Sequence, residues 1–107
     1  MESILNSIKK MLGIEDGATY FDDEIATDIN TALGILTQLG IGPSGGFSIT
    51  GPSETWQDFL GDKELEMVKS YVHLKVKTIF DPPTAGTASE AMNRMLSELE
   101  WRISVSV

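Results

Sequence analysis

The chain has 107 residues, which is enough for one domain with a single modest core. It contains no cysteine, so disulfides, thiolate metal sites and cysteine nucleophiles are excluded. Sixteen acidic against eight basic side chains give a formal net charge of −8, which disfavours nonspecific binding to nucleic acid and docking on anionic membranes. No stretch approaches the ~18 apolar residues of a membrane span, and the N terminus lacks the pattern of a signal peptide. We expect a soluble protein of the cytoplasm, or of an assembly that forms there.

Helical periodicity predicts two helices within the first forty residues. The first ends at Gly13, a natural C-terminal stop. The second begins at FDDEI, where Asp22 suits the N-cap position and the next two carboxylates suit the positive end of the helix dipole. It ends before Gly40. The apolar faces of these helices consist of Ile4, Leu5, Ile8, Met11 and Leu12 and of Ile25, Ile29, Ala32, Leu33, Leu36 and Leu39.

Residues 40 to 45 read GIGPSG and match the G-x-G-x-x-G fingerprint of dinucleotide-binding proteins. That fingerprint requires a strand before the glycines and a helix that starts at them. Here the glycines follow a predicted helix end, and residues 47–50 alternate like a short strand, so no helix begins there. Pro43 also lacks the backbone N–H that a phosphate would bind. We therefore predict a helix cap, a turn and an exposed strand-like loop, with no nucleotide cofactor.

The second half of the chain contains a short helical piece and two further helices. The short piece is TWQDFL, anchored by Trp56 and Phe59 and closed by Gly61. The third long helix is predicted from about residue 62 to Phe80, where Asp81-Pro82-Pro83 stops it. The fourth begins with a capping box between Thr87 and Glu90 and presents an inward face of Met92, Met95, Leu96, Leu99 and Ile103.

These elements predict an all-α fold. We expect a small four-helix bundle with a short helical piece and a strand-like, glycine-flanked loop between the second and third helices. No linker is long enough to split residues 1–107 into two domains. The alternating tail at residues 103–107 is compatible with an extended C-terminal arm.

The chain is poor in the residue types that carry catalysis. His73 is the only histidine, and it lies between Lys69 and Lys77 on the third helix, where two positive charges disfavour its protonated form. The acidic residues from Glu15 to Asp28 do not have the spacing of a calcium loop, and helix-start carboxylates account for three of them. We predict no catalytic residue, no metal site and no cofactor, and hence no enzyme.

The third helix carries apolar side chains on two sides. Met67, Tyr71 and Leu74 lie away from the main apolar arc, which consists of Leu65, Val68, Val72, Val76, Ile79 and Phe80. Such a helix is either central in its own bundle or exposes a second face to a partner. Phe47 and Ile49 could likewise either pack within the chain or contact a partner, because a short apolar strand with unpaired edges can pair with another subunit. On the partner interpretation, these five residues form a subunit interface.

Trp101 points roughly away from the inward face of the last helix, near Glu90 and Arg94. Tryptophan and arginine are the residues that most often anchor interfaces. The alternative is that Trp101 folds back onto the loop that contains Phe47 or onto Trp56. Together with the apolar residues above, Trp101 indicates a small helical protein that uses apolar surface for contacts.

The order of the segments resembles the small head–tail connector (head-completion adaptor) proteins of tailed bacteriophages and prophages. The resemblance covers nearly the whole chain and is carried by ILNSIKKMLGI, FDDEIATDINTALGILTQLGIGP, GGFSI, TWQDFL, VKSYVHLKVKTIFDPP and LSELEWRI. It implies a homo-oligomeric ring of roughly a dozen copies that docks beneath the portal, extends the DNA channel and offers a platform to the next neck protein. It therefore implies a place in the virion neck, reached by assembly in the bacterial host cytoplasm.

The resemblance also assigns roles to particular residues. The GGFSI loop with Phe47 and Ile49, and the second side of the third helix, become contacts between subunits. The segment from Trp101 to Val107 becomes a portal-docking arm, with Arg94, Trp101, Val105 and Val107 as docking residues. An acidic lumen would let DNA pass without specific binding, because attractive phosphate contacts would create binding wells.

Two functions of different classes follow. The first is a ring-forming structural protein of the virion, without cofactor or turnover. The second is a monomeric acidic helical module of a phage or mobile element, which regulates a basic host protein through its negative surface.

Overall fold

A computed structural model describes residues 2–15, 17–62 and 66–106. These residues form five helices and no strand, which confirms the predicted all-α fold. The helices are α1 (Ile4–Met11), α2 (Asp22–Gln38), α3 (Trp56–Leu60), α4 (Glu66–Phe80) and α5 (Gly86–Ser106). Four of them make a small bundle, and α3 is the short helical piece expected between α2 and α4. None of the described helices is long and apolar enough to span a membrane.

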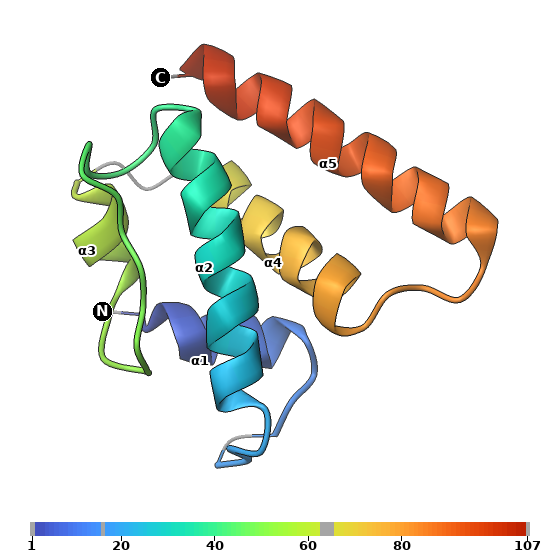
Figure 1. Ribbon diagram of the computed structural model, residues 1–107, viewed down its shortest axis with the longest axis horizontal. Coiled ribbons are helices and arrows are strands. Elements are labelled where there is room, and N and C mark those ends of the chain that lie inside the picture. The colour runs from blue at the N-terminus through green and yellow to red at the C-terminus, as the bar shows by residue number, and fades with distance from the viewer. Residues whose placement is uncertain (1, 16, 63–65, 107) are drawn as a thin grey trace.

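Helix α4 occupies the centre of the bundle. It contacts α2, α5 and α1, while α1 also contacts α2. In Figure 1, α2 crosses in front of α4, and α5 extends along the other side of α4, away from α1 and α3. The short α3 and the loop before it lie beside α2. Of the two alternatives that the sequence left open for the two-sided helix, the structure shows the one in which it is central in its own bundle.

Local sequence signals set most of the helix ends. Ser3 caps α1 by accepting a hydrogen bond from the Asn6 N–H, and Gly13 follows the helix at φ +81°. Thr55 and Asp58 form a reciprocal capping box at the start of α3. Helix α4 ends at Phe80, directly before the predicted stop.

Three boundaries differ from the prediction. Phe21 takes the N-cap position of α2, and Asp22 is the first helical residue. Helix α5 begins at Gly86, so Thr87 lies inside the helix and not at its cap. The tail is not extended, because α5 continues to Ser106; helical hydrogen bonding of the backbone prevails over the period-two alternation of the side chains. Val107 lies outside the described residues.

The core brings all five helices together. Trp56 and Phe59 of α3 are buried, and the Trp56 indole N–H donates to the Ser7 hydroxyl of α1 over 2.8 Å. Backbone hydrogen bonds from Ile4 to Glu54 and from Trp56 to the chain start join α1 to the entry of α3. The fully buried large side chains are Trp56, Tyr71, Phe59, Ile4, Leu5, Ile8, Ile25, Ile29, Leu33, Leu36, Ile103 and Val68.

A buried lysine fixes the connection between α1 and α2. The Lys9 side chain is 9% exposed, and its ammonium lies 2.8 Å from a carboxylate oxygen of Asp22 and 2.6 Å from the Ala18 carbonyl oxygen. Asp22 is also in the first turn of α2, where a carboxylate is favoured by the helix dipole. One cation therefore joins α1, the connecting loop and the start of α2.

We expect Lys9→Ala to lower the free energy of unfolding by about 3 kcal/mol, because it leaves a carboxylate and a carbonyl group without their cation. Chemical denaturation measures the change. Lys10→Ala is the matched control, since Lys10 is adjacent in sequence but exposed. Equal stability of the two variants would contradict the structural role of Lys9.

Candidate protein-binding surfaces

The outward side of α5 is a helical face that the bundle leaves uncovered. Leu96 and Ile103 are the buried residues of this 21-residue helix. At 100° per residue, Arg94, Trp101 and Val105 lie within about 40° of one another and face away from Leu96 and Ile103. We call this side, with Arg94, Glu98, Trp101, Arg102 and Val105, the outer face of α5.

Exposure confirms that Trp101 is a surface residue. Its side chain is 66% exposed, and that of Val105 is 62% exposed, so Trp101 does not fold back onto the loop or onto Trp56. Arg94 is exposed as well. Of the predicted docking residues, Arg94, Trp101 and Val105 thus share one accessible face, and Val107 lies outside the described residues. Exposed tryptophan and arginine on one rigid helix are typical of an interface anchor.

The GGFSI loop is pinned to α2 and forms no strand. The side-chain amide of Asn30 donates to the Ile49 carbonyl oxygen over 2.9 Å and its oxygen accepts from the Ile49 N–H over 2.7 Å. Ile49 is buried, and the half-buried Phe47 ring lies 5.3 Å from the Phe59 ring. The expected free strand edge is therefore wrong at Ile49, because one asparagine satisfies both of its backbone groups.

The second side of α4 is covered by α5 of the same chain. Tyr71 is fully buried, and its hydroxyl donates to a carboxylate oxygen of Glu100 on α5 over 2.8 Å. Burial raises the pKa of the Tyr71 phenol, and the Glu100 carboxylate raises it further, so Tyr71 stays a donor. Met67 and Leu74 are partly buried against the same core. Tyr71 and Ile49 thus offer no surface to another subunit, whereas Phe47, Met67 and Leu74 keep part of theirs.

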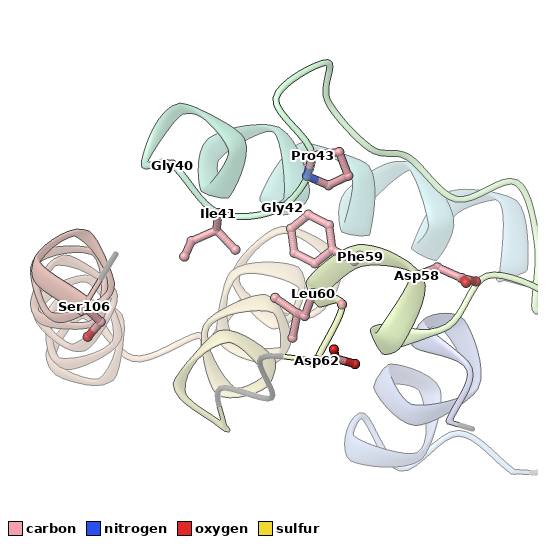
Figure 2. A pocket seen from close by; sticks show the side chains of 10 residues that line it. Gly40, Ile41, Gly42, Pro43, Asp58, Phe59, Leu60, Asp62 and Ser106 are labelled. Atoms are coloured by element: carbon pink, nitrogen blue, oxygen red, sulfur yellow. The ribbon is translucent and has the colours of Figure 1, made fainter.

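The glycine segment lines a groove between three elements. Gly40, Ile41, Gly42 and Pro43 face the end of α3 and the last turn of α5, and the groove is lined by Gly40, Ile41, Gly42, Pro43, Asp58, Phe59, Leu60, Gly61, Asp62 and Ser106 (Figure 2). The glycines follow the end of α2, and no helix begins at them, so the context of a dinucleotide site is absent. The two aspartates would also repel a phosphate.

Gly42 has a packing role in this groove. It adopts φ +84°, and a Cβ atom at this position would overlap the ring of Phe59. Because Phe59 is buried, its ring has little room to move. Gly42, one of the glycines that match the nucleotide fingerprint, therefore allows the turn after α2 to pack closely against Phe59 of α3.

His73 is partly buried on α4, and its surroundings favour the neutral ring. Burial lowers the pKa of His73, Lys77 lowers it further, and a hydrogen bond with the Met11 backbone acts in the opposite direction, so the ring is neutral at pH 7. Among the described residues, no group of three histidine or carboxylate side chains is placed to hold a metal ion. Asp16, one member of the acidic run, lies outside them.

An aromatic patch that the sequence did not predict lies at the start of α2. Tyr20 is 88% exposed and Phe21 is 49% exposed. The Phe21 ring packs edge-on against Phe80 of α4, with the ring centroids 5.3 Å apart, and Tyr20 contacts Phe21 in the same manner. The sequence feature that could have revealed this patch is the pair Tyr20-Phe21 directly before three carboxylates. Two adjacent residues at the start of a helix cannot both point into the core, so at least one of the two rings had to be exposed.

The family model described as phage connector protein matches residues 4–107. No curated protein and no solved structure matches the chain.

We expect Gly42→Ala to destabilise the protein by about 2 to 4 kcal/mol, because it combines a strained positive φ with an overlap in a packed core. Gly45→Ala is the matched control: Gly45 lacks a positive φ, and a Cβ atom there meets open space. Thermal melting compares the two variants. A Gly42→Ala protein as stable as the control would contradict the packing role of Gly42.

We expect Asn30→Ala to cost about 2 kcal/mol, since it leaves the buried N–H and C=O groups of Ile49 unpaired. Hydrogen exchange of the Ile49 amide should accelerate in parallel. Gln38→Ala, an exposed change on the same helix, serves as the control. Unchanged exchange at Ile49 in the Asn30 variant would show that another group holds the loop.

Proposed function

Since the chain belongs to the phage connector protein family, a family of structural proteins, we propose that it is a ring-forming head–tail connector of the virion neck. In this proposal, roughly a dozen copies assemble in the host cytoplasm beneath the portal protein. The ring extends the DNA channel and presents a platform to the next neck protein. The chain acts without turnover and without a cofactor.

The observation that carries the proposal is the outer face of α5. An exposed tryptophan beside exposed arginines on a long helix has no role in the fold of the monomer, whereas it suits a contact in an assembly. Two partners compete for this face: the portal protein, through Arg94, Trp101, Val105 and Val107, and a neighbouring copy of the chain. Phe47, Met67 and Leu74 are proposed as further contacts between subunits, because each remains partly accessible.

The charge of the chain supports passage of DNA without specific binding. With a net charge of −8, a ring of such subunits offers phosphates repulsion along its channel and no strong binding well. DNA would therefore move through the ring, and the protein would not retain it.

The alternative function is a monomeric acidic regulator that binds a basic protein. Residues 11–62 favour it, because this half of the chain contains nine carboxylates and no lysine or arginine. Salt separates the two functions, since binding to a basic partner weakens as ionic strength rises, whereas a ring sealed by apolar contacts persists.

We expect native mass spectrometry from low micromolar to near millimolar protein to show a closed species of high order. Trp101→Ala should weaken self-association or portal binding about 30-fold or more, the effect of removing an interface anchor. Its melting temperature should stay close to that of the unchanged protein, because Trp101 is mostly exposed.

Gln57→Ala, an exposed change on α3, is the control for the Trp101 variant. If Trp101→Ala abolished cooperative melting, Trp101 would be a core residue. If the unchanged protein neither assembled nor bound a portal, the proposed function would be wrong and the regulator would take its place.

A further inference from the structure

The charge of the chain is distributed unevenly along the sequence and over the fold. Residues 11–62 carry nine carboxylates and no basic side chain, whereas all eight lysines and arginines lie at positions 9 and 10 or between 63 and 102. Residues 11–62 include α2, α3 and their loops, and Figure 1 shows α5 on the far side of α4 from α3. The side with α2 and α3 is therefore acidic, and both arginines lie on α5; the cation at the start of α2 is Lys9 of α1, which is paired with Asp22.

On the acidic side, the aromatic residues at the start of α2 lie among exposed carboxylates. Tyr20 and Phe21 directly precede the first turn of α2, where Asp23 and Glu24 are exposed. Phe80 packs against Phe21. We call these five residues the acidic aromatic patch. Aromatic rings beside carboxylates form a surface that suits a guanidinium group, which stacks on the ring and pairs with the carboxylate.

The outer face of α5 supplies that chemistry. Arg94 and Arg102 are the only arginines of the chain, and both lie on this face with Trp101. Arg102 is paired with Glu98 over 2.8 Å, and Arg94 makes no ion pair with any described residue. Arg94 and Trp101 stand about 10 Å apart along the helix, so one partner surface can meet both.

We infer that the outer face of α5 in one copy binds the acidic aromatic patch of the next copy. Arg94 faces Asp23 and Glu24, and Trp101 packs on Tyr20 and the exposed edge of Phe21. The inference rests on the proposed function and selects a second copy, rather than the portal, as the occupant of the α5 face. Complementary charge and aromatic surface on one chain favour this choice, because each copy carries both halves of the contact.

The positions of the two surfaces allow every copy to use both at once. The patch lies at the N-terminal end of α2, whereas the C-terminal end of α5 lies near the opposite end of α2 (Figure 1). A contact between two different surfaces is heterologous, so it repeats from copy to copy and closes into a ring when the rotation between neighbours permits. In a two-fold dimer, in contrast, both surfaces of a copy would meet the same partner, so the contact would not repeat beyond two copies.

Two double variants test the contact, one for each of its two surfaces. Arg94→Glu with Trp101→Ala alters the α5 face, and Tyr20→Ser with Asp23→Lys alters the patch; all four side chains are exposed, so both proteins should fold. Circular dichroism and melting establish the fold first. Each variant alone should then associate about a hundredfold more weakly than the unchanged protein and remain monomeric in native mass spectrometry.

The two variants mixed in equal amounts should form a heterodimer and nothing larger. The α5 variant retains an intact patch and the patch variant retains an intact α5 face, so the mixture contains one functional contact and two blocked ends. A mixture that stays monomeric would overturn the inference, as would self-assembly of either variant at the unchanged affinity. A monomeric unchanged protein at every concentration would overturn it too.

The same variants separate this inference from the proposed function. If the α5 variant lost binding to a purified portal protein while the patch variant kept it, the portal would be the occupant of the α5 face and the inference would fall. If both variants still formed rings, the connector function would stand and the contact would lie elsewhere. Failure of the unchanged protein both to assemble and to bind the portal would instead remove the proposed function.

Discussion

The fold depends on the burial of α4 on two separate sides. Val68, Val72 and Val76 pack in the core that α4 shares with α1 and α2, and Tyr71 projects toward α5. The Tyr71 hydroxyl needs a partner there, because an unpaired buried hydroxyl costs about 1 to 3 kcal/mol. Glu100 provides it. The position of α5 is thereby set by apolar packing and by one directional hydrogen bond.

This arrangement leaves most of α5 free for contacts. A helix of 21 residues is about 30 Å long, and it is anchored to the bundle along one stripe that includes Leu96 and Ile103. The opposite stripe presents Arg94, Trp101 and Val105 on a backbone that is ordered by its own hydrogen bonds. An interface on such a helix loses little conformational entropy when a partner binds, because the backbone is already arranged.

Local sequence signals predicted the helices, whereas contacts between residues far apart in the sequence determine how the loop and α5 pack against them. Gly13, Thr55 with Asp58, and the stop after Phe80 act within a few residues, so the sequence suffices to find those boundaries. The pairing of Asn30 with Ile49 spans 19 residues, and Tyr71 meets Glu100 across 29, so neither is visible in a periodic pattern. Helical spacing placed Trp101 away from the inward face of α5 but left open that it folds back onto the loop or onto Trp56, and the structure decides for exposure.

The uneven charge gives a physical reason for head-to-tail association. Copies with a net charge of −8 repel one another, so an apolar contact alone would have to overcome that repulsion wherever the surfaces met. Because Arg94 and Arg102 lie on the outer face of α5 and the charged side chains of residues 11–62 are all carboxylates, we expect this repulsion to be weakest when the outer face of α5 in one copy meets the acidic side of the next. Opposed acidic sides would be the least favourable arrangement. In the proposed assembly, charge therefore favours a head-to-tail orientation, which a closed ring of more than two identical subunits requires.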